Sequence, residues 1–441
     1  MGNDIRERAE AHRLAAGTAE QATEWQDAAR EYEQCLSLVA QAGEAAGQDE
    51  AVLLTGLGRC YWNLAQARAA WRTLRRAMTL FDERGDAIGL ARATVEIRRI
   101  WGPPERQRAM VDEALEKLGD ADPYLQACLL LAQRWHDDTA LERAMALGRQ
   151  HGFEDILAVQ KEEEAWNAMN QGRVDEAKAL FQEVHESFAR LGRHDTAAAA
   201  LRGPGFGLIE LGFLDEGFAV AEQSFTYGMK THMNFQAQLA LMDMAGVPFA
   251  RGDFARCEEL VALAPTDSDF RGDVFRMWIA EARGDIDRAF QLMVSPERGG
   301  STPTAMGQIH AAAAGLLYRT GKRDAAAQAL RAWAAVERGS DGVAYWEEAP
   351  AMVECLIALG DDDLLRTVDG ALRARDERAV GRARFSTLQG RSLYPLRAAL
   401  AARLGRPDEA EQHYREGVVW CSEAGCGADA ESCRRGLASL T

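Results

Sequence analysis

The stretch from Gly172 to Ala177 constrains the fold of this chain more than any other, because it has the pattern of a tight turn in a helical hairpin. Gly172 permits the positive φ that ends one helix, and Asp175 and Glu176 place negative charge at the amino-terminal end of the next. The same order recurs from Gly405 to Ala410, again with the alanine five positions after the glycine. The turn therefore belongs to a repeat.

Equivalent turn positions can be aligned along the whole chain. They are Thr23, Ala65, Gly102, Trp135, Gly172, Gly212, Gly252, Gly284, Gly321, Gly360 and Gly405. Their spacing averages about 38 residues, enough for two helices of three to four turns and two short loops. Ala is abundant, Pro is scarce at 11 residues, and no long stretch alternates apolar and polar residues. The sequence therefore predicts an all-α chain of about eleven helical hairpins.

The second helix of each predicted hairpin carries a stripe of small and apolar side chains. In the fifth hairpin the stripe is Ala177, Phe181 and Val184. Residues at this spacing share one face of a helix, and a lone hairpin could not bury that face. We therefore expect the hairpins to stack into one solenoid domain of residues 1–441, with candidate flex points at 101–104 and 295–303.

The glycine-to-alanine step, with an aromatic or aliphatic residue four positions later, resembles the tetratricopeptide repeat. Gly252-Asp253-Phe254 is also close to that family's Gly-Asp-Tyr turn. The resemblance covers most of the chain and implies a right-handed α-solenoid. Because the units exceed the roughly 34-residue standard, they look similar to the sensor halves of maltose-regulator-type bacterial activators. We find neither the ATPase module nor the helix-turn-helix of those regulators in the sequence.

The resemblance also implies where a partner would bind, since the first helices of tetratricopeptide hairpins line a concave groove. Counting back from the central turns selects large aromatic side chains and isolated charges. The groove candidates are Glu162, Trp166, Met169, Arg202, Phe206, Ile209, Glu210, Met242, Phe249, Trp278, Glu281, Tyr318 and Arg319. Such a surface suits a peptide or a small amphipathic ligand. The alternative is that the aromatic residues are core, because a register error of one residue would bury Trp166 or Trp278.

Glycine and proline fall inside two predicted first helices, at 202–207 and 246–248. Because Gly and Pro cost a helix interior roughly 1 and 3 kcal/mol, we expect these helices to be weakened or kinked, or to start later. A kink could open a pocket. The run Gly203, Gly205 and Gly207 fails the dinucleotide-binding spacing and follows no strand, so we interpret it as turn chemistry.

Three functions fit these observations. We favour a cytoplasmic scaffold or regulatory adaptor that binds a protein or peptide in its groove. The alternatives are a small-molecule-sensing effector module related to bacterial transcriptional regulators, and an enzyme with its pocket at the broken helices 203–248. No catalytic motif stands out, so an enzyme is the less favoured reading, and we predict no cofactor.

Several partner classes are disfavoured by composition and spacing. The chain has 51 basic and 68 acidic side chains, and its net charge of −17 opposes nucleic-acid binding. No apolar run approaches the roughly 18 residues of a membrane span, and the charged amino terminus lacks the apolar core of a secretory signal. Cys421, Cys426 and Cys433 cluster without C-x-x-C spacing, so we interpret them as packing residues and predict no metal site.

Overall fold

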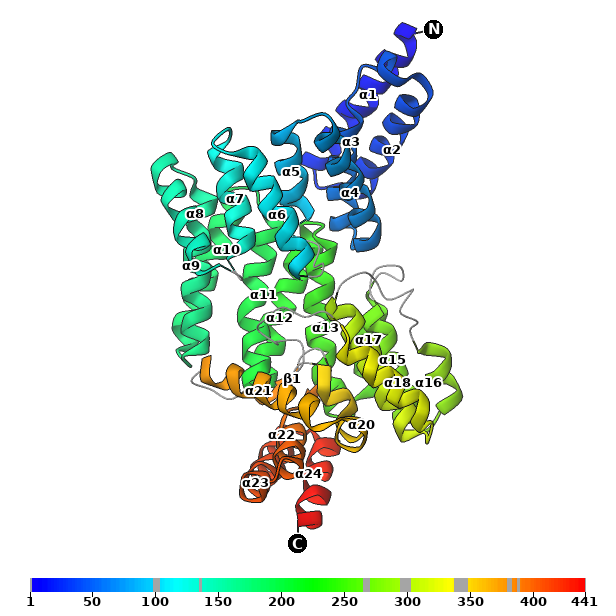
Figure 1. Cartoon of the computed structure of the whole chain (residues 1–441), viewed down its shortest axis with the longest axis vertical. Helices are drawn as coiled ribbons and strands as arrows, with labels where there is room; N and C mark the ends of the chain where they lie inside the picture. The colour runs from blue at the N-terminus through cyan, green and yellow to red at the C-terminus, as the bar shows by residue number, and fades with distance from the viewer. Residues whose placement is uncertain are drawn as a thin grey trace. The chain divides into compact units, whose positions relative to one another are not determined.

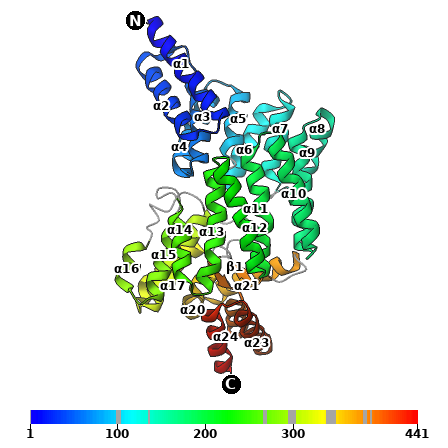
Figure 2. The ribbon, with the colours of Figure 1, turned by 180° about the vertical axis from the view of Figure 1, so that it is seen from behind.

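The computed structural model describes residues 2–97, 104–134, 137–264, 270–293, 303–336, 348–378, 383–386 and 389–440. Figures 1 and 2 show these residues as α-helices joined by short turns, so the predicted all-α solenoid of helical hairpins is confirmed. The chain divides into two compact units. The first comprises Met1–Glu162, Val184–Ala198 and Tyr227–Ala237, and the second comprises Glu163–Glu183, Ala199–Thr226 and Gln238–Thr441.

Four helical hairpins open the first unit. Their helices are α1 (Gly2–Gln21), α2 (Trp25–Ala42), α3 (Glu50–Asn63), α4 (Ala67–Glu83), α5 (Ala87–Ile97), α6 (Pro104–Leu118), α7 (Pro123–Gln133) and α8 (Asp138–His151), with a 3-10 turn η1 (Gly43–Ala46) after α2. The next five helices contribute residues to both units. They are α9 (Glu154–Asn170), α10 (Val174–Arg190), α11 (His194–Leu211), α12 (Leu214–Lys230) and α13 (Asn234–Ala250).

The described residues in the rest of the second unit are also mainly helical, with one very short pair of β-strands. Its helices are α14 (Phe254–Ala262), α15 (Phe270–Ala282), α16 (Ile286–Leu292), α17 (Pro303–Arg319), α18 (Arg323–Ala334), the 3-10 turn η2 (Ala349–Met352), α20 (Val353–Leu359), α21 (Asp362–Arg378), α22 (Tyr394–Arg403), α23 (Pro407–Glu423) and α24 (Gly427–Leu440). Strands β1 (Phe385–Ser386) and β2 (Arg391–Ser392) pair antiparallel, with Phe385 opposite Ser392. The sequence analysis did not predict these strands.

The predicted turns close the hairpins by one shared hydrogen-bond pattern. At Gly172, with φ of 72°, the Gly172 N–H donates to the Met169 carbonyl at 3.0 Å and the Arg173 N–H to the Ala168 carbonyl at 2.9 Å. This is the Schellman arrangement, which requires the left-handed conformation at the turn residue. The predicted turn residues with positive φ are Thr23, Ala65, Gly172, Gly212, Gly252, Gly284, Gly321 and Gly405.

Three predicted turn positions differ from this pattern. Gly360 has φ of −70° and an extended conformation, so α20 ends without a left-handed residue. Gly102 and Trp135 lie outside the described residues. The two predicted flex points also lie mostly outside the described residues, which lack 101–103 and 295–302. Pro104 and Pro303 at their ends begin α6 and α17.

The stripe on the second helices forms the core, as predicted. Ala177, Phe181 and Val184 are each at most 1% exposed, and the corresponding Ala70, Leu74 and Ala77 are fully buried. The turns between hairpins, which the sequence analysis did not align, use the left-handed conformation as well, for example Gly192 with φ of 69°. The same device therefore ends both helices of many repeats.

Candidate functional site

Helices α11 and α13 of the second unit carry charged and aromatic side chains that we call the arginine–carboxylate face. It comprises Arg202, Phe206, Glu210 and Asp243. The first three stand four residues apart on α11 and so share one side of that helix. Asp243 comes from α13, the first helix of the next hairpin. The repeat thus brings residues some 40 positions apart into one surface.

Arg202 and Asp243 form a bidentate ion pair between the two helices. The Arg202 Nε donates to Asp243 Oδ2 at 2.5 Å, and Nη2 donates to Oδ1 at 2.9 Å. Asp243 is only 1% exposed, and the Arg202 guanidinium also lies 5.1 Å from the centre of the Phe206 ring. Planar, doubly hydrogen-bonded pairs of this kind fix both side chains in position.

Glu210 is a buried carboxylate, and burial disfavours its charged form. Burial raises its pKa, Arg375 of α21 and Arg202 lower it, and Asp243 raises it, so that the pKa stands at about 7. The Arg375 Nη2 lies 3.4 Å from Glu210 Oε2. Because its pKa is near neutrality, Glu210 changes charge in the range where most carboxylates stay ionised.

The chain's own residues 384–386 and 389–393 lie against α11 and α13. The Arg384 N–H donates to the carbonyl of Glu210 at 2.8 Å. A Cβ added to Gly390 would lie 2.9 Å from the Gly246 carbonyl oxygen, and the Arg391 guanidinium is 5.6 Å from the Phe249 ring centre. Described residues of the β-hairpin therefore contact the carboxy-terminal parts of α11 and α13.

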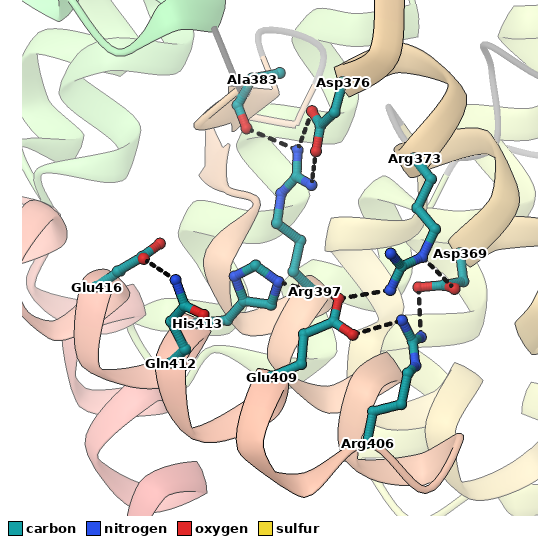
Figure 3. A network of polar contacts seen from close by, with 10 residues as sticks. All are labelled: Asp369, Arg373, Asp376, Ala383, Arg397, Arg406, Glu409, Gln412, His413 and Glu416. Atoms are coloured by element: carbon teal, nitrogen blue, oxygen red, sulfur yellow. Dashed lines mark hydrogen bonds and ion pairs between the residues drawn. The ribbon is translucent and has the colours of Figure 1, made fainter.

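A polar network on α21, α22 and α23 anchors the base of this hairpin (Figure 3). Arg397 donates to Asp376 on α21 and, through Nη2 at 3.1 Å, to the carbonyl of Ala383, the residue before Arg384. Glu409 accepts from Arg373 at 2.5 Å and from Arg406 at 2.7 Å. Because Arg397 is 7% exposed, this anchor is protected from water.

Gly203, Gly205 and Gly207 in α11 allow neighbouring side chains and helices to pack closely against it. The interpretation of this glycine run as turn chemistry is therefore wrong. Helices α11 and α13 are continuous, with Pro204 and Pro248 inside them, so the expectation of broken or late-starting helices is wrong. A Cβ on Gly205 would lie 2.8 Å from the Ala221 backbone nitrogen. The neighbouring glycines face Phe181 and Met169 in the same way. Packing of α11 against its neighbours outweighs the helix cost of these residues.

The remaining groove candidates fall into three groups. The half-buried Trp166 packs edge-on against Phe181 and Phe206, with ring centres 5.0 and 6.5 Å apart. Met169, Ile209, Met242 and Trp278 are each at most 3% exposed and belong to the core, so the expectation that they face an open groove is wrong for these four.

The third group consists of charged and polar candidates outside the face. Arg319 pairs with Glu281 through two hydrogen bonds of 2.6 and 2.9 Å, and Tyr318 lies 5.9 Å from the guanidinium of Arg323. Glu162 belongs to the first unit, where its carboxylate is 3.9 Å from Arg134. The structure therefore brings together Trp166, Arg202 and Phe206, with Glu210 on the same side of α11. Phe249 is 7% exposed and packs in the core against Phe275 and Trp278.

Sequence reasoning missed several residues of the site, namely Asp243, Arg375, Gly390 and Arg391. One signal was available, because Asp243 is the sole charged residue between Asn234 and Ala250. An isolated acid in an otherwise apolar helix needs a partner. The hairpin gave no comparable signal, since its strands have two residues each.

Two structural features bear on membranes and metals. Among the described helices, none combines the length and apolar character that crossing a membrane requires. Within the same residues, no three His, Cys, Asp or Glu side chains are grouped so that they could hold a metal ion. The eight cysteines are all buried free thiols.

Comparisons with known proteins found similarity at the level of structure alone. No family model matches the sequence, and no curated protein matches it. The chain is similar to the crystal structure of yeast Tom70, with 12% identity, coverage of 97% and 96% of the two chains, and a TM-score of 0.29. It is also similar to the P58(IPK) TPR domain, with 10% identity, 98% coverage of both chains and a TM-score of 0.28.

A third similar structure is an IFIT1 monomeric mutant with Gppp-AAAA, at 12% identity, coverage of 100% and 95%, and a TM-score of 0.34. Identities and TM-scores this low carry no functional argument. The function is therefore argued from the arginine–carboxylate face.

Proposed function

We propose that this chain is a protein- or peptide-binding helical-repeat scaffold, with the arginine–carboxylate face as its binding surface. One observation supports the proposal: helices α11 and α13, which carry this face, already hold extended residues of the chain itself. The contact with that segment uses a helix carbonyl, that of Glu210, and an aromatic ring, that of Phe249. These are the elements by which proteins hold an extended peptide.

The accessible part of the face consists of Arg202 and Phe206, which are half-buried, and the half-buried Trp166 packs beside Phe206. Aromatic and arginine side chains dominate the binding energy of protein interfaces. Their ring-to-ring and ring-to-guanidinium contacts fix their orientation before a partner arrives, which reduces the entropy lost on binding. The acidic net charge of −17 favours a partner with basic groups over a nucleic acid.

A displayed library of random peptides, selected on the full chain, tests this proposal. Selected peptides are then titrated by fluorescence anisotropy against wild type, Phe206→Ser and the control Phe213→Ser. Phe213 is 50% exposed in the turn after α11 and lies outside the face. We expect Phe206→Ser to weaken binding about tenfold or more and Phe213→Ser to leave it unchanged. Equal affinities for the two variants, or failure to select any peptide, would count against the proposal.

A second candidate function is a small-molecule-sensing effector module related to bacterial transcriptional regulators. The observation that favours it is an open surface depression of about 510 Å³ at α21, α22 and the following turn, lined by ion-paired side chains that include Asp362, Arg366, Asp369, Arg403 and Arg406. A polar depression of this size suits a charged metabolite. A metabolite screen by thermal shift separates the two candidates, because a ligand that binds the folded state raises Tm.

A further inference from the structure

Asp243 binds one side of the Arg202 guanidinium and leaves the other side available. Its two oxygens accept from Nε at 2.5 Å and from Nη2 at 2.9 Å. Both N–H groups of Nη1 and the second one of Nη2 therefore remain. None of the described residues accepts a hydrogen bond from Nη1. The Arg202 side chain is 21% exposed and that of Asp243 is 2% exposed, so the accessible part of the pair is the arginine.

The remaining N–H groups of Arg202 are held beside an aromatic surface. The guanidinium lies 5.1 Å from the centre of the Phe206 ring. The Phe206 ring in turn meets Trp166 edge-on, with ring centres 6.5 Å apart and ring planes at 79°. A long side chain loses rotamer freedom when a partner orders it, but here the ordering occurs on folding and not on binding. The face thus presents oriented donors next to two aromatic rings.

The charges around Arg202 favour a neutral hydrogen-bond acceptor over an anion. Asp243 compensates the charge of Arg202, and the Glu210 Oε2 lies 3.4 Å from the Arg375 Nη2. The face therefore carries no excess positive charge, and the whole chain has a net charge of −17. A carboxylate or phosphate bound to Arg202 would be repelled by Asp243. A peptide carbonyl offers an acceptor oxygen without that charge.

We propose that Arg202 donates to a main-chain carbonyl oxygen of an extended partner segment, and that an apolar side chain of that segment packs on Phe206 and Trp166. This inference rests on the proposed peptide-binding function and names what the face recognises. Successive residues of an extended segment point to opposite sides, so a carbonyl and a neighbouring side chain can reach the face together. Arg202 touches the partner, and Asp243 is a positioning residue that acts through Arg202.

Replacing both members of the pair tests the donor without leaving a buried charge unpaired. Arg202→Met combined with Asp243→Leu puts apolar side chains in their place, and such replacements of buried pairs are often neutral for stability. The probe is the tightest-binding peptide selected from the random library, titrated by fluorescence anisotropy. We expect the double variant to bind it about tenfold or more weakly. Glu216→Gln is the control and should match wild type, because Glu216 forms an exposed pair with Lys178 between successive hairpins.

A thioamide scan of the same peptide identifies the bound carbonyl and needs no change in the protein. Sulfur is a weak acceptor, so replacing the bound oxygen by sulfur should weaken binding to wild type roughly two- to tenfold. The double variant should bind this analogue and the parent peptide equally. Asp243→Asn keeps Arg202 but holds it less firmly, so it should reduce the thioamide penalty. A purely structural role of Asp243 would weaken both peptides alike and leave the penalty unchanged.

The outcomes separate this inference from the proposed function. If the peptide binds in a Phe206-dependent manner but no thioamide position weakens its binding to wild type, the inference is overturned and the proposed function stands. An undiminished thioamide penalty in the double variant would also overturn it. If no peptide can be selected, both fail. Urea unfolding checks that the double variant is folded, and if it is destabilised the scan on wild type decides.

Discussion

Replacing Gly205 by alanine tests whether the glycine run in α11 exists for helix packing. The added Cβ would lie 2.8 Å from the Ala221 backbone nitrogen and 3.1 Å from the Gly217 carbonyl oxygen, both on α12. These atoms cannot move without shifting the helix. Overpacking of this kind costs roughly 1–3 kcal/mol, offset by about 1 kcal/mol from the better helix propensity of alanine. We therefore expect Gly205→Ala to be neutral to destabilising.

Gly370→Ala is the control for this substitution, because Gly370 is exposed on α21 and an added Cβ would meet nothing within 4 Å. It should gain about 1 kcal/mol of stability from helix propensity alone. Urea unfolding followed by circular dichroism measures both variants, and their free energies of unfolding should differ by roughly 1–3 kcal/mol. If Gly205→Ala gained as much as Gly370→Ala, the packing explanation of the glycine run would be refuted.

Three further predictions concern titration, thiols and turns. The folded-state pKa of Glu210 is about 7 against an ordinary 4.5, so the folded chain keeps a proton that the unfolded chain releases, and stability falls as pH rises through this window. Glu210→Gln should remove that slope from urea titrations at stepped pH; an unchanged slope would contradict the assignment. Burial raises the pKa of Cys257 and Cys426 to about 12, so no cysteine should react promptly with a thiol reagent before unfolding; prompt native-state modification, read by absorbance, would contradict this. Thr23 has φ of 58°, a conformation that costs a β-branched residue about 1 kcal/mol, so Thr23→Gly should raise the unfolding midpoint of the first unit; a lower midpoint would show that Thr23 makes compensating contacts.

The repeat was predictable from the sequence because each turn depends on local chemistry. A left-handed residue after a helix is required wherever a Schellman turn closes it, and Gly172 or Gly405 satisfies that requirement without reference to distant residues. Thr23 and Ala65 could be identified as turn positions only because they continue the regular spacing of the repeat. Gly360 also falls at the regular spacing of the repeat, yet its backbone is extended and not left-handed. The repeat spacing therefore predicts where a turn lies but not its backbone conformation.

The site was harder to predict because its parts meet only after folding. Arg202, Phe206 and Glu210 could be selected from their spacing on one helix. The segment around Arg391 follows α21 in the chain, and no local signal connects it with α13, more than 130 residues earlier. The glycines within α11 were misinterpreted for a related reason. Their role depends on contact with the backbone of α12, and helix propensity describes one helix without its neighbours.

The ion pair of Arg202 with Asp243 differs in burial from the exposed pairs that link successive hairpins. Arg84 with Asp49 and Lys178 with Glu216 are also about one repeat apart, but each of their side chains is at least 36% exposed. Exposed pairs contribute roughly 0–1 kcal/mol, so they add little beyond fixing the register. Asp243 has a side-chain exposure of 2%, and the desolvation cost of a buried carboxylate is often not recovered by its ion pair. Stability alone therefore does not account for a charge at this position, whereas the two hydrogen bonds from Arg202 explain it as the group that fixes the Arg202 guanidinium against Phe206.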